Sequence, residues 1–221
     1  MTWVKICGTT NLEDALVAVE AGADAVGFVF YEKSPRRIGV EAARKIVEKL
    51  PERVEKVGVF VNETEDALCR VADSALLTAV QMHGDNEDPH VADLVVDKRP
   101  KLKVFAAVSM SGQNPHGWAM MWRPDVVHAF LVDSGNSTKP GGTGEKFDWR
   151  SSVPVLWNIK ILGRVVAAGG LNPGNVAEAI DILEPWGVDV ASGVETIPGK
   201  KDPEKVRAFV KAVREMDQKA S

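Results

Sequence analysis

Two side chains capable of acid-base chemistry directly follow apolar segments, Cys7 after Ile6 and Asp133 after Val132. A free cysteine has a pKa of about 8.5, so roughly a few per cent is thiolate at pH 7, and a helix starting near Asn11 is expected to lower that pKa. A carboxylic acid at the end of an apolar strand is costly unless it is paired, hydrogen-bonded or used in a reaction. We therefore interpret Cys7 as a base and Asp133 as an acid that act on one substrate.

Both residues also have a purely structural interpretation. Most free cysteines are small buried hydrophobic residues, and Cys69, beside Leu68 in an expected helix, fits that description. Asp133 would in that case cap the loop that follows it. The place of Cys7 at a strand end, just before Gly8, favours reactivity instead.

Two adjacent arginines follow the apolar run at 25–30. They lie in the loop Ser34-Pro35-Arg36-Arg37-Ile38. A guanidinium there would bind a carboxylate through two parallel hydrogen bonds. The spacing does not decide whether Arg36 or Arg37 points inward, and an exposed surface arginine is the commoner arrangement.

Two glycine-containing loops favour a substrate that carries a phosphate. Gly169-Gly170 follows the seventh apolar run and Ser192-Gly193 the eighth. In parallel barrels, the loops after strands seven and eight often bind phosphate through exposed amides and a helix N-terminus. Neither loop is specific by itself, but both loops at this place in the fold predict a phosphate-binding site.

The segment 134–145 is too long for a simple connector. Its glycines, Gly135, Gly141, Gly142 and Gly144, would permit the backbone freedom of a lid over the site. A plain surface loop is the alternative.

Metal and nucleotide sites are not expected. The four histidines, His83, His90, His116 and His128, do not have the spacing of metal ligands, and the chain has no Walker loop or dinucleotide-binding glycine motif. Of these, only His83 ends an apolar run, and we expect it to hydrogen-bond near the pocket and to help bind substrate. The sequence therefore predicts neither a metal ion nor a cofactor.

The scaffold for these residues is predicted from short apolar runs that alternate with amphipathic segments about every 20 to 30 residues. Eight runs are present, at 3–7, 25–30, 56–61, 79–83, 102–108, 127–133, 164–168 and 188–192. Their nearly continuous apolar character indicates parallel strands covered on both faces. Eight βα units close into a barrel, whereas an open doubly wound sheet usually has about five or six strands. The prediction is an α/β fold, a single (β/α)8 TIM-barrel domain over residues 1–221.

In such a barrel the active site lies where the strands end, so the residues at these ends are the first candidates for function. They are Cys7, Phe30, Val61, His83, Val108, Asp133, Gly169 and Ser192.

Several helix ends are predicted from capping residues. Asn11 is expected to cap the first helix and Gly22 to end it, and Asp202-Pro203 is expected to begin the last helix. A fifth helix is expected within 112–123. The run Met120 to Trp122 in it is interpreted as a stripe that faces the core.

Composition limits the partners. The 221 residues include 27 basic and 31 acidic side chains, for a net charge of −4, and no long basic run is present. A small molecule is therefore expected as partner, rather than nucleic acid or a membrane, and the two glycine-containing loops predict that it carries a phosphate. Two cysteines do not make a disulfide framework, and the first residues lack a signal peptide's apolar core, so a cytoplasmic protein is expected. Both a monomer and a homodimer stay open.

Motifs spread almost from end to end resemble a known family. They are Val4-Lys5-Ile6-Cys7-Gly8, Gly22-Ala23-Asp24-Ala25-Val26-Gly27-Phe28, Ser34-Pro35-Arg36, Val57-Gly58-Val59-Phe60-Val61-Asn62, Gln81-Met82-His83-Gly84, Gly141-Gly142-Thr143-Gly144, Phe147-Asp148-Trp149, Gly169-Gly170-Leu171-Asn172-Pro173 and Asp189-Val190-Ala191-Ser192-Gly193-Val194-Glu195. The family that they resemble is phosphoribosylanthranilate isomerase of tryptophan biosynthesis.

The resemblance implies an Amadori rearrangement without a cofactor, from N-(5-phosphoribosyl)anthranilate to 1-(2-carboxyphenylamino)-1-deoxyribulose 5-phosphate. Asp133 matches the family's general acid, which protonates the furanose ring oxygen, and Cys7 matches the base that removes the C2′ proton. Arg36 matches the residue that holds the anthranilate carboxylate. The loops at Gly169-Gly170 and Ser192-Gly193 match the phosphate site.

The sequence departs from the family pattern at Arg37, where an aromatic residue is frequent, and at Met82, where leucine is usual. The related isomerase of the histidine pathway has an aspartate where this chain has Cys7. A metal-dependent pentulose-phosphate epimerase would need ligands on several strands, and indole-glycerol-phosphate synthase would need catalytic lysines. A barrel that binds a phosphate ligand without turnover is the alternative of a different class.

Overall fold

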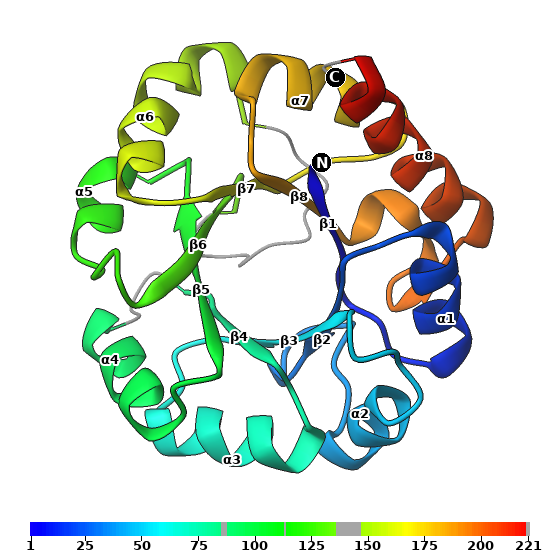
Figure 1. Ribbon diagram of the computed structural model, residues 1–221, viewed down its shortest axis with the longest axis vertical. Coiled ribbons are helices and arrows are strands. Elements are labelled where there is room, and N and C mark those ends of the chain that lie inside the picture. Colours follow the sequence, from blue (N-terminus) through cyan, green and yellow to red (C-terminus); the bar gives the residue numbers. More distant parts are fainter. Residues whose placement is uncertain (85–87, 113, 136–146, 220–221) are drawn as a thin grey trace.

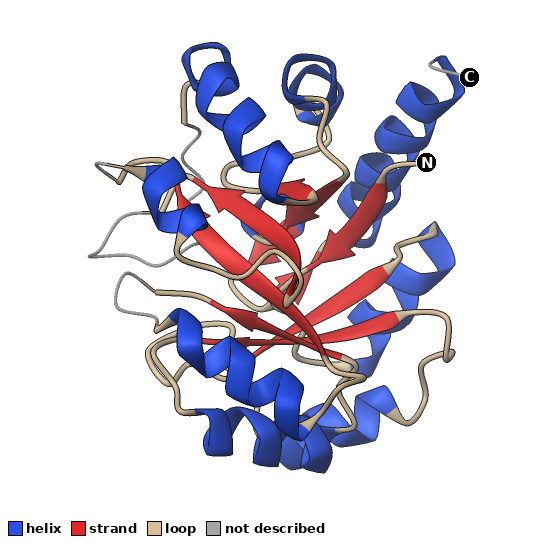
Figure 2. Ribbon diagram, turned by 60° about the vertical axis from the view of Figure 1, so that its left-hand side comes forward, coloured by secondary structure: helices blue, strands red, loops and turns tan. Residues whose placement is uncertain are grey.

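The computed structural model describes residues 1–84, 88–112, 114–135 and 147–219. These residues form a closed barrel of eight parallel strands in which each strand pairs with the next and β8 pairs with β1. Helices surround the strands on the outside (Figures 1 and 2). The predicted (β/α)8 architecture is thereby confirmed.

The strands lie within one or two residues of the predicted apolar runs. They are β1 (Trp3–Ile6), β2 (Ala25–Val29), β3 (Glu55–Phe60), β4 (Ala79–Met82), β5 (Lys103–Ser109), β6 (Val127–Asp133), β7 (Val165–Ala167) and β8 (Gly187–Val190). The helices are α1 (Leu12–Ala21), α2 (Val40–Val47), α3 (Glu65–Ala75), α4 (Pro89–Lys98), α5 (Pro115–Met120), α6 (Trp149–Leu162), α7 (Val176–Leu183) and α8 (Pro203–Lys219). After β8 come a 3-10 turn (Ser192–Val194) and a hairpin of β9 (Glu195–Ile197) and β10 (Lys200–Lys201).

The predicted helix ends are confirmed where capping residues marked them. The side chain of Asn11 accepts a hydrogen bond from the Asp14 amide at 2.9 Å, and Gly22 ends α1 with a φ of 95°. Asp202 accepts from the Glu204 amide at 3.0 Å, in front of the proline that begins α8. These short-range signals set where the helices start and stop.

Side chains alternate between the two faces of each strand. On β1, Val4 and Ile6 belong to the large apolar layer between strands and helices, whereas Trp3 points into the barrel. At the end where the strands begin, Trp3 stacks on Phe105 and Trp186 with ring centroids 5.4 and 5.2 Å apart. These rings close that end of the barrel and leave the opposite end for the site.

Two sequence-based expectations need correction. Met120 and Met121 are each 61% exposed, because α5 ends at Met120, and only Trp122 of the expected stripe is buried. Phe30 and Val108, proposed as strand-end candidates, pack in the outer apolar layer instead of the barrel interior. Position at a strand end is therefore not sufficient, since the alternation of the strand decides which side chains reach the site.

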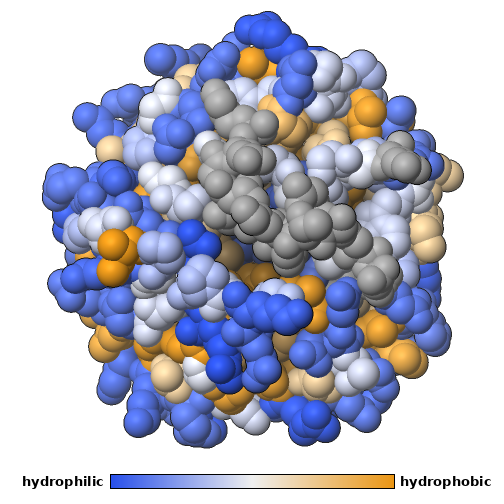
Figure 3. All heavy atoms as spheres, turned by 180° about the vertical axis from the view of Figure 1, so that it is seen from behind, coloured by the Kyte–Doolittle hydropathy of each residue, from blue (hydrophilic) through white to orange (hydrophobic). Residues whose placement is uncertain are grey.

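Seen from behind (Figure 3), the described surface is mostly hydrophilic, with apolar residues interspersed among polar ones. Among the described helices, none combines the length and the apolar character that crossing a bilayer requires.

Candidate active site

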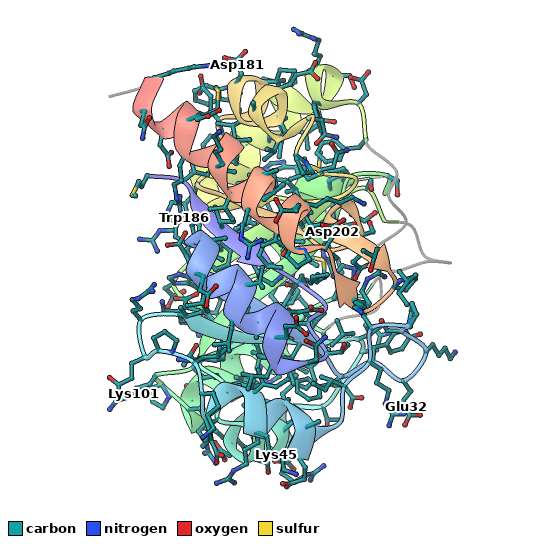
Figure 4. All side chains as sticks on the ribbon, turned by 90° about the vertical axis from the view of Figure 1, so that its right-hand side faces the viewer. Glu32, Lys45, Lys101, Asp181, Trp186 and Asp202 are labelled. Atoms are coloured by element: carbon teal, nitrogen blue, oxygen red, sulfur yellow. The ribbon has the colours of Figure 1, made fainter. Side chains whose placement is uncertain are left out.

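A pocket opens where the strands end. Figure 4 shows the two ends of the barrel: Trp186 and Lys101 lie at one, and Glu32 and Asp202 lie toward the other. The pocket is lined by Cys7, Val29, Tyr31, Ser34, Arg36, Val59, Val61, Gln81, His83, Leu131, Asp133, Asp189 and Ala191. The sequence-predicted candidates Cys7, Asp133, Arg36 and His83 thus meet in one place, although they come from four different loops or strands.

Cys7 immediately follows β1 and is held by its backbone. Its amide donates to the carbonyl of Val190 at 2.8 Å, and its carbonyl accepts from Lys201 Nζ at 2.6 Å. The residue is only 7% exposed. Burial raises the pKa of its thiol, and the nearby Lys5 ammonium offsets this only in part. The thiol pKa therefore lies above its ordinary value, because burial outweighs the neighbouring positive charges. The lowering expected from the following helix stays a prediction.

Asp133 is the last residue of β6 and is buried. Its carboxylate accepts a hydrogen bond from the amide of Gly135, two residues further on. The capping interpretation is therefore correct for this oxygen. The side chain lines the pocket at the same time, so capping holds the carboxyl group in place at the site.

Arg36, and not Arg37, lies at the pocket. The Arg36 side chain is 11% exposed, and its Nε and Nη2 groups donate to Glu195 at 2.9 and 2.7 Å. Within the described chain, no acceptor contacts its Nη1 group. Arg37 is 54% exposed and pairs with Glu32 on the surface. Glu195 thus orients one edge of the guanidinium and leaves the other for a ligand.

Lys201 connects this arrangement to the strands. Its buried Nζ donates to three acceptors, the carbonyls of Cys7 and Ala191 and the carboxylate of Glu195, at 2.6, 3.2 and 3.0 Å. Burial lowers the pKa of Lys201 and Glu195 offsets this only in part. For Glu195, burial acts to raise the pKa, but Arg36 and Lys201 outweigh it and the pKa is lowered.

The two loops expected to bind phosphate lie side by side. Gly169 and Gly170 adopt φ values of 78° and 65°, and no described residue accepts a hydrogen bond from their amides. A Cβ on Gly193 would lie 1.9 Å from the carbonyl oxygen of Leu171, so the second loop crosses the first in backbone contact. The Asn175 side chain, at the start of α7, donates to the Gly170 carbonyl at 2.9 Å. Unpaired amides in front of a helix start suit an anion.

Ser192 begins the 3-10 turn of the second loop. His83 follows β4, and its Nδ1 lies 3.3 Å from Gln81 Nε2. The hydrogen bond expected of His83 near the pocket is therefore present.

Sequence reasoning missed the charged groups in the middle of the barrel. Lys5 Nζ donates to Gln81 Oε1 at 2.6 Å and lies 3.0 Å from Asp189 Oδ1. The signal was available, because Lys5 stands two residues before Cys7 and must share its face of the strand. A search restricted to strand ends does not find Lys5, because it precedes the strand end by two residues.

The expected lid lies outside the described residues, except for 134 and 135, so its glycines Gly141, Gly142 and Gly144 stay a prediction. Among the described residues, no three His, Cys, Asp or Glu side chains gather closely enough to bind a metal ion.

Comparisons with known proteins agree with this geometry. The sequence pattern of the family described as N-(5'phosphoribosyl)anthranilate (PRA) isomerase matches residues 4–212. The chain is 49% identical over 217 residues to an N-(5'-phosphoribosyl)anthranilate isomerase of Geobacter sp. strain M21, covering 98% of this chain and 100% of the relative. It is 46% identical over 211 residues to the isomerase of Thermotoga maritima, covering 96% and 98%.

Solved structures are similar as well. The crystal structure of the Thermotoga maritima isomerase superposes with a TM-score of 0.86 at 43% identity, covering 97% of this chain and 100% of the other. An isomerase in complex with reduced 1-(o-carboxyphenylamino)-1-deoxyribulose 5-phosphate has a TM-score of 0.83 at 42% identity, with the same coverage.

Proposed function

Because the chain belongs to the phosphoribosylanthranilate isomerase family, we propose that Cys7 and Asp133 are the base and the acid of its reaction. The protein is an isomerase of tryptophan biosynthesis and converts N-(5-phosphoribosyl)anthranilate to 1-(2-carboxyphenylamino)-1-deoxyribulose 5-phosphate. The observation that carries the proposal is that both side chains line one pocket, at the end of the barrel where barrel enzymes react.

The reaction needs two proton transfers. Asp133 donates a proton to the furanose ring oxygen, the C1′–O bond breaks, and the anthranilate nitrogen supplies electrons to form a Schiff base. Cys7 as thiolate then removes the C2′ proton, which gives an enolamine, and tautomerisation of the enolamine yields the ketose. Each transfer needs the donor or acceptor within hydrogen-bond reach of the substrate, so both groups must face one ligand.

The same pocket has groups for the two charged ends of the substrate. We assign the carboxylate of anthranilate to the unoccupied edge of Arg36, where a guanidinium can form two hydrogen bonds. We assign the phosphate to the amides of Gly169 and Gly170 and to the turn at Ser192-Gly193. His83 would contact the substrate between these ends.

The proposal extends to the rest of the molecule. We propose that residues 1–221 act as one barrel domain, in the cytoplasm, without a metal or other cofactor. A Thermotoga maritima isomerase is described as dimeric and was crystallised as monomers, so both a monomer and a homodimer are compatible with the family.

The test is turnover of freshly made phosphoribosylanthranilate by the purified protein, followed by the loss of anthranilate-type fluorescence. Cys7→Ser and Asp133→Asn should each lower kcat at least about 100-fold, the range that acid-base groups supply. Cys69→Ser, at the other, buried cysteine, is the matched control and should keep full activity. A Cys7→Ser or Asp133→Asn enzyme with near-normal kcat would overturn the assignment, and loss of activity with a chelator would overturn the absence of a metal.

A further inference from the structure

A lysine is fully buried inside the barrel, between the stacked rings of Trp3, Phe105 and Trp186 at one end and the pocket at the other. Lys5 is 1% exposed. Its partners are Gln81 from β4, at 2.6 Å, and Asp189 from β8, at 3.0 Å. Burying a charged pair is unfavourable unless the geometry and further hydrogen bonds compensate for the lost hydration, so an apolar side chain of similar volume would fill this space at a lower free-energy cost. The proton transfers by Asp133 and Cys7 do not involve the ammonium of Lys5.

The side chain of Lys5 lies next to the side chain of Cys7 inside the barrel. The two residues are two apart on one strand and therefore share the inner face. Gly27 of β2 leaves the space into which both side chains extend, since a Cβ there would lie 2.8 Å from Cys7 Sγ and 2.9 Å from Lys5 Cε. No side chain of β2 separates the sulfur from the lysine chain.

We propose that Lys5 is a positioning residue for the isomerisation, whose buried ammonium stabilises the thiolate of Cys7, while its partner Asp189 limits that stabilisation. The inference rests on the proposed role of Cys7 as the base. A base that must be a thiolate at a buried position needs a positive charge close by, and a charge held by Gln81 and Asp189 does not have to reorganise when the thiol ionises.

The electrostatics of the site have the signs that this role requires. Burial raises the pKa of Cys7; Lys5 and Lys201 act to lower it, and Asp189 acts to raise it. For Lys5, burial acts to lower the pKa, but Asp189 and Cys7 outweigh it and the pKa is raised, which keeps the ammonium charged. The other titratable groups that line the pocket are Tyr31, Arg36, His83 and Asp133.

A purely structural ion pair makes a different prediction. If Lys5 and Asp189 only filled and stiffened the barrel, removing either would loosen the site and change Cys7 in the same way. If they act through charge, removal of the lysine and removal of the aspartate must shift the ionisation of Cys7 in opposite directions.

The experiment measures the pH dependence of Cys7 alkylation by iodoacetamide, in a Cys69→Ser background, by mass spectrometry. Lys5→Met should move the midpoint to higher pH by at least about 1 unit, and Asp189→Asn should move it to lower pH. Lys56→Met is the matched control. Lys56 is also a buried strand lysine, but its Nζ donates to the Pro51 carbonyl at 2.8 Å, and its loss should not move the midpoint.

Shifts in the same direction, or no shift in a folded Lys5→Met variant, would overturn the proposal. If that variant does not fold, the Lys5→Met/Asp189→Asn protein, which leaves no unpaired buried charge, replaces it. Its midpoint should lie above that of Asp189→Asn alone, and equal midpoints would refute the coupling.

Alkylation does not depend on turnover, so it tests the effect of Lys5 on the thiol of Cys7 independently of whether Cys7 is the base of the reaction. The acidic limb of the kcat/KM profile should shift in Lys5→Met by the same amount as the alkylation midpoint. If alkylation shifts and the kcat/KM profile does not, Lys5 acts on the thiol but Cys7 is not the base.

Discussion

The guanidinium of Arg36 is hydrogen-bonded to Glu195 along one edge, and its other edge is available to a ligand in the pocket. Its partner Glu195 is in turn bonded to Lys201, so three buried or nearly buried charges lie together with a sum of one positive charge. A single carboxylate would neutralise that sum. The guanidinium is also held in one orientation before a ligand arrives, which lowers the entropy that binding costs.

Replacement of Arg36 should therefore weaken substrate binding. Arg36→Met should raise KM at least about 10-fold with kcat changed much less, because a charge-assisted hydrogen bond contributes roughly 1.5–3 kcal/mol. Steady-state kinetics over a wide substrate range would measure both constants. Arg37→Met is the control, since that side chain is 54% exposed and, within the described part of the chain, forms an ion pair only with Glu32. An unchanged KM for Arg36→Met would move the carboxylate to another group.

The sequence predicted a candidate residue only where its position at the end of a strand was sufficient to place it in the pocket. Cys7 and Asp133 followed from the rule that barrel sites lie at strand ends, and the structure places both at the pocket. Spacing alone left the choice between Arg36 and Arg37 open, because that choice depends on Glu195, which lies 159 residues away along the chain, and only the family resemblance pointed to Arg36. Lys5 does not follow from the strand-end rule, because it reaches the barrel interior through the alternation of the strand two residues before Cys7.

At the scale of the elements, the loops after β7 and β8 form one unit. Gly193 in the second loop crosses the Leu171 carbonyl of the first, and Asn175 ties the first loop to the start of α7. The amides assigned to phosphate therefore depend on close backbone packing between two loops. Neither loop alone would hold the amides in this arrangement.

A methyl group at this crossing should disturb phosphate binding. In Gly193→Ala the new Cβ would lie 1.9 Å from a backbone oxygen, so one loop must move. We expect KM to rise at least about 10-fold, the effect of losing one charge-assisted contact, measured by steady-state kinetics and by competition with inorganic phosphate. Gly39→Ala, where a Cβ meets nothing within 4 Å, is the control. Equal KM values for the two variants would contradict the phosphate assignment.

Element boundaries were predictable where a local signal exists. Asn11, Gly22 and Asp202 mark helix ends through hydrogen bonds to residues close in sequence, and the structure has them as expected. The short α5 lacks such a signal at its end, and Met120 and Met121 were consequently assigned to the core although they are exposed. Their burial depends on tertiary packing, which sequence periodicity over one or two turns does not determine.

At the scale of the whole molecule, the barrel closes where the first strand meets the last. Lys201 lies at that closure and donates to the carbonyls of Cys7, after β1, and Ala191, after β8. It also neutralises the buried Glu195. One side chain from the hairpin after β8 thus joins the first and last strands of the sheet and supports Cys7, the proposed base, and Arg36.

Loss of this lysine should destabilise the entire barrel. Lys201→Met leaves two carbonyls without their donor and removes one partner of a buried ion pair, which typically costs about 3–5 kcal/mol. Urea unfolding, followed by circular dichroism, would measure the loss. Lys205→Met, at a partly exposed lysine nearby that bonds the Glu195 carbonyl at 3.0 Å, should cost no more than about 1–2 kcal/mol. Equal losses for the two variants would show that Lys201 has no special part in closure.

The same cluster makes stability depend on pH. Burial acts to raise the pKa of Glu195, but Arg36 and Lys201 outweigh it, so the folded pKa lies below the unfolded value of about 4.3. The carboxylate therefore stabilises the fold fully above about pH 4.3, and this contribution is lost as the pH falls through the folded pKa.

Urea midpoints at pH 7 and at successively lower pH should show that the difference in midpoint between the native protein and Glu195→Gln shrinks with acidification. Glu32→Gln, at a carboxylate 83% exposed, should show no such gap. A gap for Glu195→Gln that stays constant down to pH 3 would mean that the cluster stabilises the barrel through packing and not through charge.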